Sequence, residues 1–214
     1  DFQEEMGSPT VVSAVSLHKE KLKSDFLLII DGPRHPSNKP TLTFGARGIS
    51  RITLTSYGPI KPQHSGHFGN YAPNPAMNLS KVLSSMKDYD GRVVIPGFYD
   101  GVTFSDEIKL VMDAVPDDEV QIKKELMISS ADKVGKNYQE AIQFPSLNIR
   151  GLQSGWVRKE VRTIVPDIAI AEIDVRLVKE SNPKRLLNLI KEHIISEGAY
   201  VIEDREPSSD ERLT

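Results

Sequence analysis

Hydrophobic and polar residues follow two different patterns along the chain. Residues 10–25 read TVVSAVSLHKEKLKSD, which is typical of a short amphipathic helix, and residues 26–30 read FLLII without polar alternation. Such an unbroken apolar run is typical of a strand buried on both faces, as in a parallel sheet covered by helices. We therefore expect a helix and then a buried strand that ends at Asp31, the pattern of an α/β domain.

Beyond residue 44 the pattern changes to long strands in which apolar and polar residues alternate. The two long examples are residues 47–57 (RGISRITLTSY) and 168–178 (IAIAEIDVRLV). Shorter strand candidates lie at Val161, Val165 and residues 200–202. Alternation of this kind predicts an antiparallel sheet with one covered face. In residues 47–57 the apolar positions slip by one residue, which is compatible with a β-bulge.

Two helices are expected between these strands. Residues 75–86 carry an apolar stripe behind a first-turn proline, and residues 183–198 carry a second one, with Ser181 or Asn182 as N-cap. The order strand, helix, strand, strand, helix, strand is that of a ferredoxin-like two-layer sandwich, an α+β fold. A charged segment of helical character at residues 105–135 is expected to be an insertion into this order.

Composition and charge narrow the possible functions. The chain has 27 Lys and Arg residues against 30 Asp and Glu residues, a net charge of −3. It lacks the basic excess that phosphate neutralisation needs, so we expect no nucleic-acid binding as a main activity. No apolar run reaches the roughly 18 to 20 residues of a membrane span, so we expect no membrane insertion. The absence of cysteine excludes a disulfide framework, and it fits a reducing compartment such as the cytoplasm.

Three carboxylates near the N-terminus are candidates for chemistry. Glu4 and Glu5 precede a turn marked by Gly7 and Pro9, where one carboxylate can bind a metal and the other can accept a proton from water. An adjacent Glu pair is more often a solvated surface pair. Asp31 follows the apolar run directly, at the position where α/β sheets place ligands, although an aspartate there also commonly caps a turn.

Two further positions carry candidate polar chemistry. His64 and His67 flank a Ser-Gly pair in a glycine-rich loop, which suits either zinc binding or donation of a hydrogen bond to an oxyanion. No third or fourth zinc ligand lies nearby in the sequence. Arg176 lies in an alternating strand, where it can pair with Glu172 or Asp174 on the same face.

Several segments occur in an order that resembles a known family. They are residues 4–9 (EEMGSP), the strand end at Asp31, residues 44–49 (FGARGI), 64–66 (HSG), 73–75 (PNP), 145–149 (PSLNI), 163–166 (TIVP) and 174–178 (DVRLV). In this order they resemble the di-zinc metallopeptidases and deacylases that include carnosine dipeptidase, succinyl-diaminopimelate desuccinylase and acetylornithine deacetylase. The resemblance covers almost the whole chain.

The resemblance implies a catalytic centre with two zinc ions at each active site. Glu4 matches the general base, Glu5 matches a zinc ligand, and Asp31 matches the carboxylate that binds the other zinc. Manganese or cobalt would suit the same carboxylate and imidazole ligands. Relatives also bring a His-x-Asp motif and a bridging Asp from upstream sequence and a final His from downstream sequence, and none of these is matched here.

The resemblance also implies roles for four residues of a lid domain. His64 matches a histidine that reaches across a homodimer to stabilise the oxyanion in the partner's active site. Arg176 matches the arginine that binds the terminal carboxylate of the substrate, and Thr163 and Asn148 match polar positions that line the same pocket. A planar guanidinium suits a carboxylate, and a donor imidazole suits developing negative charge.

These observations predict three parts in the chain and a function for the whole. Residues 1–44 are expected to be a remnant of a catalytic α/β domain, residues 45–205 a lid and dimerisation domain, and residues 206–214 a return toward the catalytic domain. The expected function is hydrolysis of a peptide or N-acyl amino acid by a longer zinc enzyme, with this part inactive by itself. The alternative is a non-catalytic dimerisation or peptide-binding module.

Overall fold

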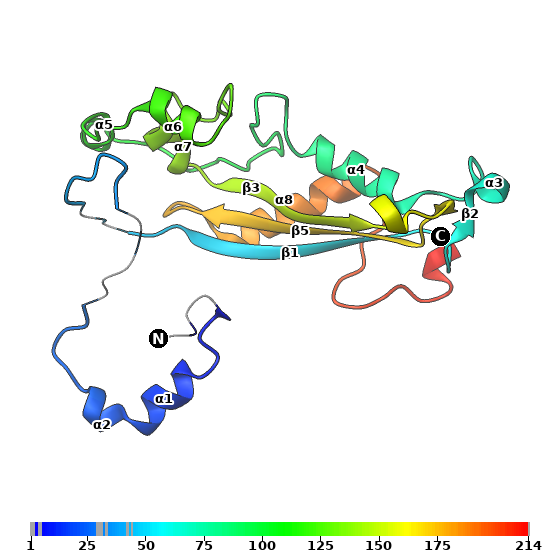
Figure 1. The fold of residues 1–214 in the computed structure, drawn as a ribbon, viewed down its shortest axis with the longest axis horizontal. Helices are drawn as coiled ribbons and strands as arrows, with labels where there is room; N and C mark the ends of the chain where they lie inside the picture. Colours follow the sequence, from blue (N-terminus) through cyan, green and yellow to red (C-terminus); the bar gives the residue numbers. More distant parts are fainter. Residues whose placement is uncertain are drawn as a thin grey trace. The chain divides into compact units, whose positions relative to one another are not determined.

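The structure is a computed structural model that describes residues 3, 6–28, 32, 34–41, 43 and 45–213 (Figure 1). The chain divides into two compact units, Asp1–Thr41 and Leu42–Thr214. None of the helices in the described ranges is both long and apolar enough to cross a lipid bilayer.

The first unit contains two short helices, α1 (Val11–Leu17) and α2 (Lys19–Leu22), in agreement with the predicted amphipathic helix. The strand predicted for residues 26–30 is wrong in its described part, because Phe26, Leu27 and Leu28 have no regular structure and are 80–91% exposed. A strand needs a neighbouring strand to complete its backbone hydrogen bonds. The described residues of this unit contain no such neighbour.

The second unit is built on an antiparallel sheet with the strand order β1-β5-β3. Its strands are β1 (Gly48–Tyr57), β3 (Ser146–Ser154) and β5 (Ile168–Leu177). A smaller sheet pairs β2 (Gln63–His64) with β4 (Ile164–Val165). The alternating strands predicted from the sequence are therefore present, and β5 is the central strand of the main sheet.

Strand register differs from the prediction at one point. The β1–β5 ladder runs without interruption from Gly48–Leu177 to Tyr57–Ile168, so β1 contains no bulge. The irregularity lies in β3 instead, between Ile149 and Gly151. An extra residue there re-aims the side chains on either side of it.

Two helices pack against the sheet, α4 (Pro75–Ser85) and α8 (Pro183–Ser196), as predicted. Each begins with a proline in its first turn and an asparagine cap, since Asn74 accepts a hydrogen bond from the Ala76 amide and Asn182 accepts one from the Arg185 amide. Both helices contribute to one hydrophobic core with every second residue of β5. Its members on these elements are Leu79, Leu83, Ala169, Ala171, Ile173, Val175, Leu186 and Ile190.

The segment predicted as a helical insertion contains α5 (Asp106–Asp113) and α6 (Glu119–Glu125), followed by α7 (Tyr138–Ile142). Figure 1 shows these three helices at one end of the sheet and α3 (Ser65–Phe68) with β2 at the other end. The strand predicted at residues 200–202 does not form in the structure. The α+β class is confirmed, with three strands in the described main sheet.

Candidate functional site

One group of polar side chains gathers at the end of β5 that carries Arg176. Asp174 is buried, with 6% of its surface exposed. Its Oδ1 accepts a hydrogen bond from Asn148 Nδ2 at 3.0 Å, and its Oδ2 accepts one from Arg176 Nε at 3.2 Å. The β3–β5 register produces this cluster, because Asn148 lies opposite Asp174 and Ser146 lies opposite Arg176.

This arrangement prepares Arg176 for a ligand. Asp174 uses Nε, and the two terminal nitrogens of Arg176 make no hydrogen bond with a described residue. The side chain is 46% exposed, so its outer edge is accessible. A guanidinium held in this way can bind a carboxylate through two parallel hydrogen bonds.

The structure also decides the pairing that the sequence leaves open. Arg176 pairs with Asp174, whereas Glu172 accepts hydrogen bonds from Thr53 Oγ1 at 3.1 Å and from Arg150 at 3.2 Å. Asp174 is thus a site residue that sequence reasoning does not single out. Its signal in the sequence is a carboxylate at i−2 from the arginine, on the same face of an alternating strand.

A second group lies at the other end of the sheet, around His64. His64 pairs with Ile164 in the β2–β4 ladder, and the Ser65 amide donates to the carbonyl oxygen of Thr163 at 3.1 Å. His64 Nδ1 accepts a hydrogen bond from the Gly66 amide at 3.0 Å. Because Nδ1 is an acceptor, a neutral His64 ring carries its proton on Nε2. The exposed ring therefore presents an N–H donor.

The two groups are far apart in a single chain. Ile168 and Arg176 are eight residues apart on β5, which at about 3.3 Å per residue separates their Cα atoms by about 26 Å. Figure 1 shows β2, which carries His64, beyond the end of β5 that begins at Ile168, and the Thr163 carbonyl is bonded to the neighbouring Ser65 amide. The resemblance assigns Asn148 and Thr163 to one pocket with Arg176, but within one chain only Asn148 lies beside Arg176.

The predicted metal centre falls largely outside the described part of the chain. Glu4, Glu5 and Asp31, the predicted base and ligands, all lie outside the described residues. Among the residues that the structure does describe, no group of three or more histidines and carboxylates is placed to hold a metal ion. The zinc ligands therefore remain a prediction from the sequence.

The fold and these two groups define an α+β domain that presents polar side chains at both ends of its central strand. Residues 44–200 match the M20 family described as Peptidase dimerisation domain, and the chain therefore belongs to this family. The predicted resemblance to the metallopeptidases of the carnosine dipeptidase type is thereby confirmed.

Individual relatives agree with this assignment. The chain is 29% identical over 178 residues to a Cys-Gly metallodipeptidase of Candida albicans, covering 82% of this chain and 37% of that protein. It is 27% identical over 199 residues to the human Beta-Ala-His dipeptidase, covering 89% and 39%. The structure of an M20 family metallo-carboxypeptidase from Sulfolobus solfataricus superposes with a TM-score of 0.72 at 29% identity, covering 92% and 45%. The chain thus spans 37–39% of the length of these two curated relatives.

Proposed function

We propose that this chain is the dimerisation and lid part of a zinc-dependent metallopeptidase or amidohydrolase that hydrolyses peptide or N-acyl amide bonds. The expected type is a dipeptidase or exopeptidase, because two relatives are named dipeptidases and a third a carboxypeptidase. The chain would supply the dimer contacts and part of the substrate-binding surface. A cytoplasmic location fits a sequence without cysteine.

The observation that carries this proposal is the separation of the two polar groups on the lid. A dipeptide spans only about 7 Å, whereas the part of β5 between Ile168 and Arg176 alone spans about 26 Å, so a dipeptide cannot contact both His64 and Arg176 of one chain. In a two-fold symmetric dimer, however, each active site can take Arg176 from one subunit and His64 from the other. A homodimer would then be required for a complete site.

Each residue has a role that suits its geometry. Arg176, fixed by Asp174 and assisted by Asn148, would bind the terminal carboxylate of the substrate. His64 would donate its Nε2 proton as a hydrogen bond to the oxygen that gains negative charge. Thr163 would line the same half of the pocket as His64.

The metal part of the proposal rests on the sequence. Glu5 and Asp31 would be ligands of the two zinc ions, with Glu4 as the base that accepts and returns a proton. Two bound zinc ions would supply electrophilic stabilisation of the reacting carbonyl and an activated water. Manganese or cobalt would be accepted by the same ligand types.

Subunit mixing tests the proposal directly in the enzyme that we propose contains this chain. The His64→Asn and Arg176→Met variants are each expected to lose most of their activity as homodimers toward a panel of dipeptides and N-acyl amino acids. In a mixed dimer, one of the two sites combines an intact His64 with an intact Arg176. Co-refolding equal amounts is therefore expected to restore about one quarter of the wild-type rate.

Two controls complete this test. If both residues served a site within one subunit, every mixed site would carry one defect and mixing would restore nothing. Chelator treatment and the Glu4→Gln variant are expected to abolish turnover in every sample, and zinc is expected to restore it after chelation. A folded, zinc-loaded enzyme that is inactive across the whole panel would instead favour a non-catalytic dimerisation or peptide-binding module.

A further inference from the structure

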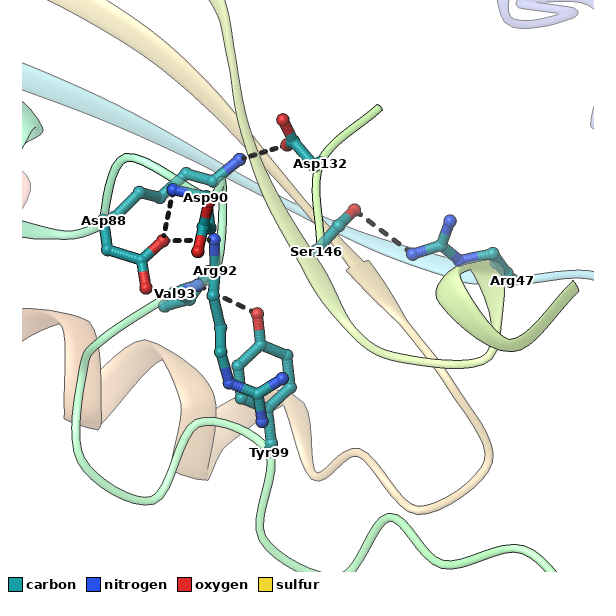
Figure 2. Close-up of polar contacts among 9 residues, drawn as sticks. Arg47, Asp88, Asp90, Arg92, Val93, Tyr99, Asp132 and Ser146 are labelled. Carbon is teal, nitrogen blue, oxygen red and sulfur yellow. Dashed lines mark hydrogen bonds and ion pairs between the residues drawn. The ribbon is translucent and has the colours of Figure 1, made fainter. Parts of the chain in front are cut away.

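Arg47 lies directly before β1, and its guanidinium reaches the first residue of β3. Its Nη2 donates to Ser146 Oγ at 3.1 Å, as Figure 2 shows, and to the carbonyl oxygen of Phe144 at 2.9 Å. Ser146 is also the residue that pairs with Arg176 in the β3–β5 ladder. Arg47 and Arg176 therefore flank the same residue at one end of the sheet.

One buried carboxylate pairs with Arg176, and its charge also acts on Arg47. Asp174 forms an ion pair with Arg176 at 3.2 Å. Burial and then the positive charge of Arg176 lower the pKa of Arg47, while the charge of Asp174 acts in the opposite direction. Neighbouring cations that are partly removed from water disfavour each other's charge, so a further anion between them would be stabilised.

Arg47 also has hydrogen-bonding capacity that the described part of the chain does not use. Its Nε is buried and has no hydrogen-bond partner among the residues that the structure describes. Its Nη1 makes no hydrogen bond with a described residue. Buried polar atoms in native proteins nearly always have a partner, so an unpartnered guanidinium nitrogen calls for an explanation.

A purely structural role for Arg47 does not account for these features. Only Nη2 holds Phe144 and Ser146, and a neutral amide donor would make such bonds without placing a second cation near Arg176. The positive charge has a use if a negatively charged group of a ligand enters between the two arginines. Arginine pairs are well suited to carboxylates, because each guanidinium offers several donors in one plane.

We propose that Arg47 and Arg176 together form a paired binding site for a carboxylate, with Arg47 as the second carboxylate-binding residue. The proposal deepens the proposed function and rests on it for the identity of the ligand, the anionic end of a peptide or N-acyl amino acid. Asp174 holds Arg176 from the buried side, and Ser146 holds Arg47. The pair then favours substrates with a free carboxylate over their amides.

Binding to the chain itself tests this proposal without any hydrolysis. The chain is titrated with N-acetylglycine and, separately, with its neutral amide at constant ionic strength, and the side-chain Nε–Hε NMR signals of arginine are followed. N-acetylglycine is expected to shift the signals of both Arg47 and Arg176, and the amide is expected to shift neither. Arg47→Gln and Arg176→Gln should each weaken carboxylate binding about tenfold.

Two further variants separate charge from fold. Arg150→Gln is the matched control, because Arg150 is an exposed arginine on the same sheet that pairs with Glu172, and it is expected to leave binding unchanged. Arg47→Lys keeps the charge but not the planar fork, so it should weaken binding less than Arg47→Gln does. If Arg47→Gln does not fold, carboxylate binding by Arg47→Lys and the shift of the Arg47 signal in the wild-type chain still test the proposal.

Binding that depends on Arg176 but is unchanged by either Arg47 variant would overturn the proposal, as would a titration in which N-acetylglycine leaves the Arg47 signal in place. This result is independent of the proposed enzyme activity. Carboxylate binding by the chain without peptidase activity of the enzyme would contradict only the proposed function. An active enzyme whose chain shows no Arg47-dependent binding would contradict only the paired site.

Discussion

Arg176 and Asp174 lie two residues apart on the same face of β5, and their side chains are joined by a 3.2 Å hydrogen bond from Nε to Oδ2. The carboxylate is buried and the guanidinium is nearly half exposed. The buried partner restricts the exposed one, so Arg176 reaches a ligand with little further loss of side-chain freedom. Such preorganisation is a general way to gain affinity without new contacts.

Removing the second hydrogen-bond donor to Asp174 is predicted to lower the stability of the fold. Asn148→Ala leaves Asp174 Oδ1 without the 3.0 Å hydrogen bond from Nδ2, at a site that water reaches poorly. We expect a loss of about 1–3 kcal/mol in the free energy of unfolding, measured by urea denaturation. Gln153→Ala, an exposed position on the same strand, is the control and should change stability little. Equal losses for both variants would show that the bond to Asp174 adds no stability.

The core under β5 predicts a larger effect. Ile173 is completely buried, between the sheet and the two helices that cover it. Ile173→Ala is expected to lower the free energy of unfolding by about 2–5 kcal/mol, because it removes apolar contacts and leaves a cavity. The control is Ile60→Ala, since Ile60 is 76% exposed. A small loss at Ile173 would mean that the core can collapse into the vacated space.

The C-terminal segment predicts a dependence on pH. Hydrogen bonds from Arg205 and from Ser208 lower the pKa of Glu211 from 4.5 to about 2. A depressed carboxyl pKa stabilises the folded segment above the unfolded-state value, and this stabilisation is lost as pH falls from 4.5 toward about 2. The Ser208 N–H donates to Glu211 Oε2 at 2.8 Å, so the protection of this amide, its exchange rate relative to the intrinsic rate at each pH, should fall over that range.

Salt and substitution supply the controls for this pH effect. Both partners are near the surface, so added salt should weaken the contrast. Glu211→Gln should remove most of the pH dependence of Ser208 protection, while Glu206→Gln should leave it in place. An NMR titration in which the Glu211 carboxyl changes near its ordinary pKa would contradict the bidentate pairing with Arg205 at 2.6 and 2.7 Å.

Local sequence rules predict the helices well because their determinants are local. The Asn-Pro pairs at residues 74–75 and 182–183 supply a cap and a first-turn proline, and α4 and α8 begin there. Alternation likewise predicts β1 and β5. Residues 26–28 fail as a strand because strand formation depends on a neighbour, which no local pattern specifies.

Residue types and their order in the sequence are enough to predict candidate site residues such as Arg176. The sequence alone does not decide whether Arg176 pairs with Glu172 or Asp174, because both neighbours lie on its face. Register decides it: Asn148 lies opposite Asp174, and Arg150 reaches Glu172 next to the bulge in β3. The relevance of Arg47 depends on a contact with Ser146 across 99 positions of sequence, which pattern reasoning does not reach.

The hydrogen bond from the Gly66 amide to His64 Nδ1 predicts different roles for the two ring nitrogens of His64. Asparagine can retain the acceptor at Nδ1 but loses the Nε2 donor, whereas glutamine can place an N–H close to Nε2. In the proposed enzyme we therefore expect His64→Asn to lower kcat by about 10² to 10³ with little change in KM, and His64→Gln to retain more activity. His67→Gln is the matched control, because His67 is an exposed histidine whose ring centroid lies 4.8 Å from that of His64, and it should leave kcat nearly unchanged.

Nitrogen chemical shifts of the chain should also report the Nε2–H tautomer of neutral His64. An Nδ1–H tautomer, or equal losses in kcat for the Asn and Gln variants, would contradict a role for His64 as an Nε2 donor.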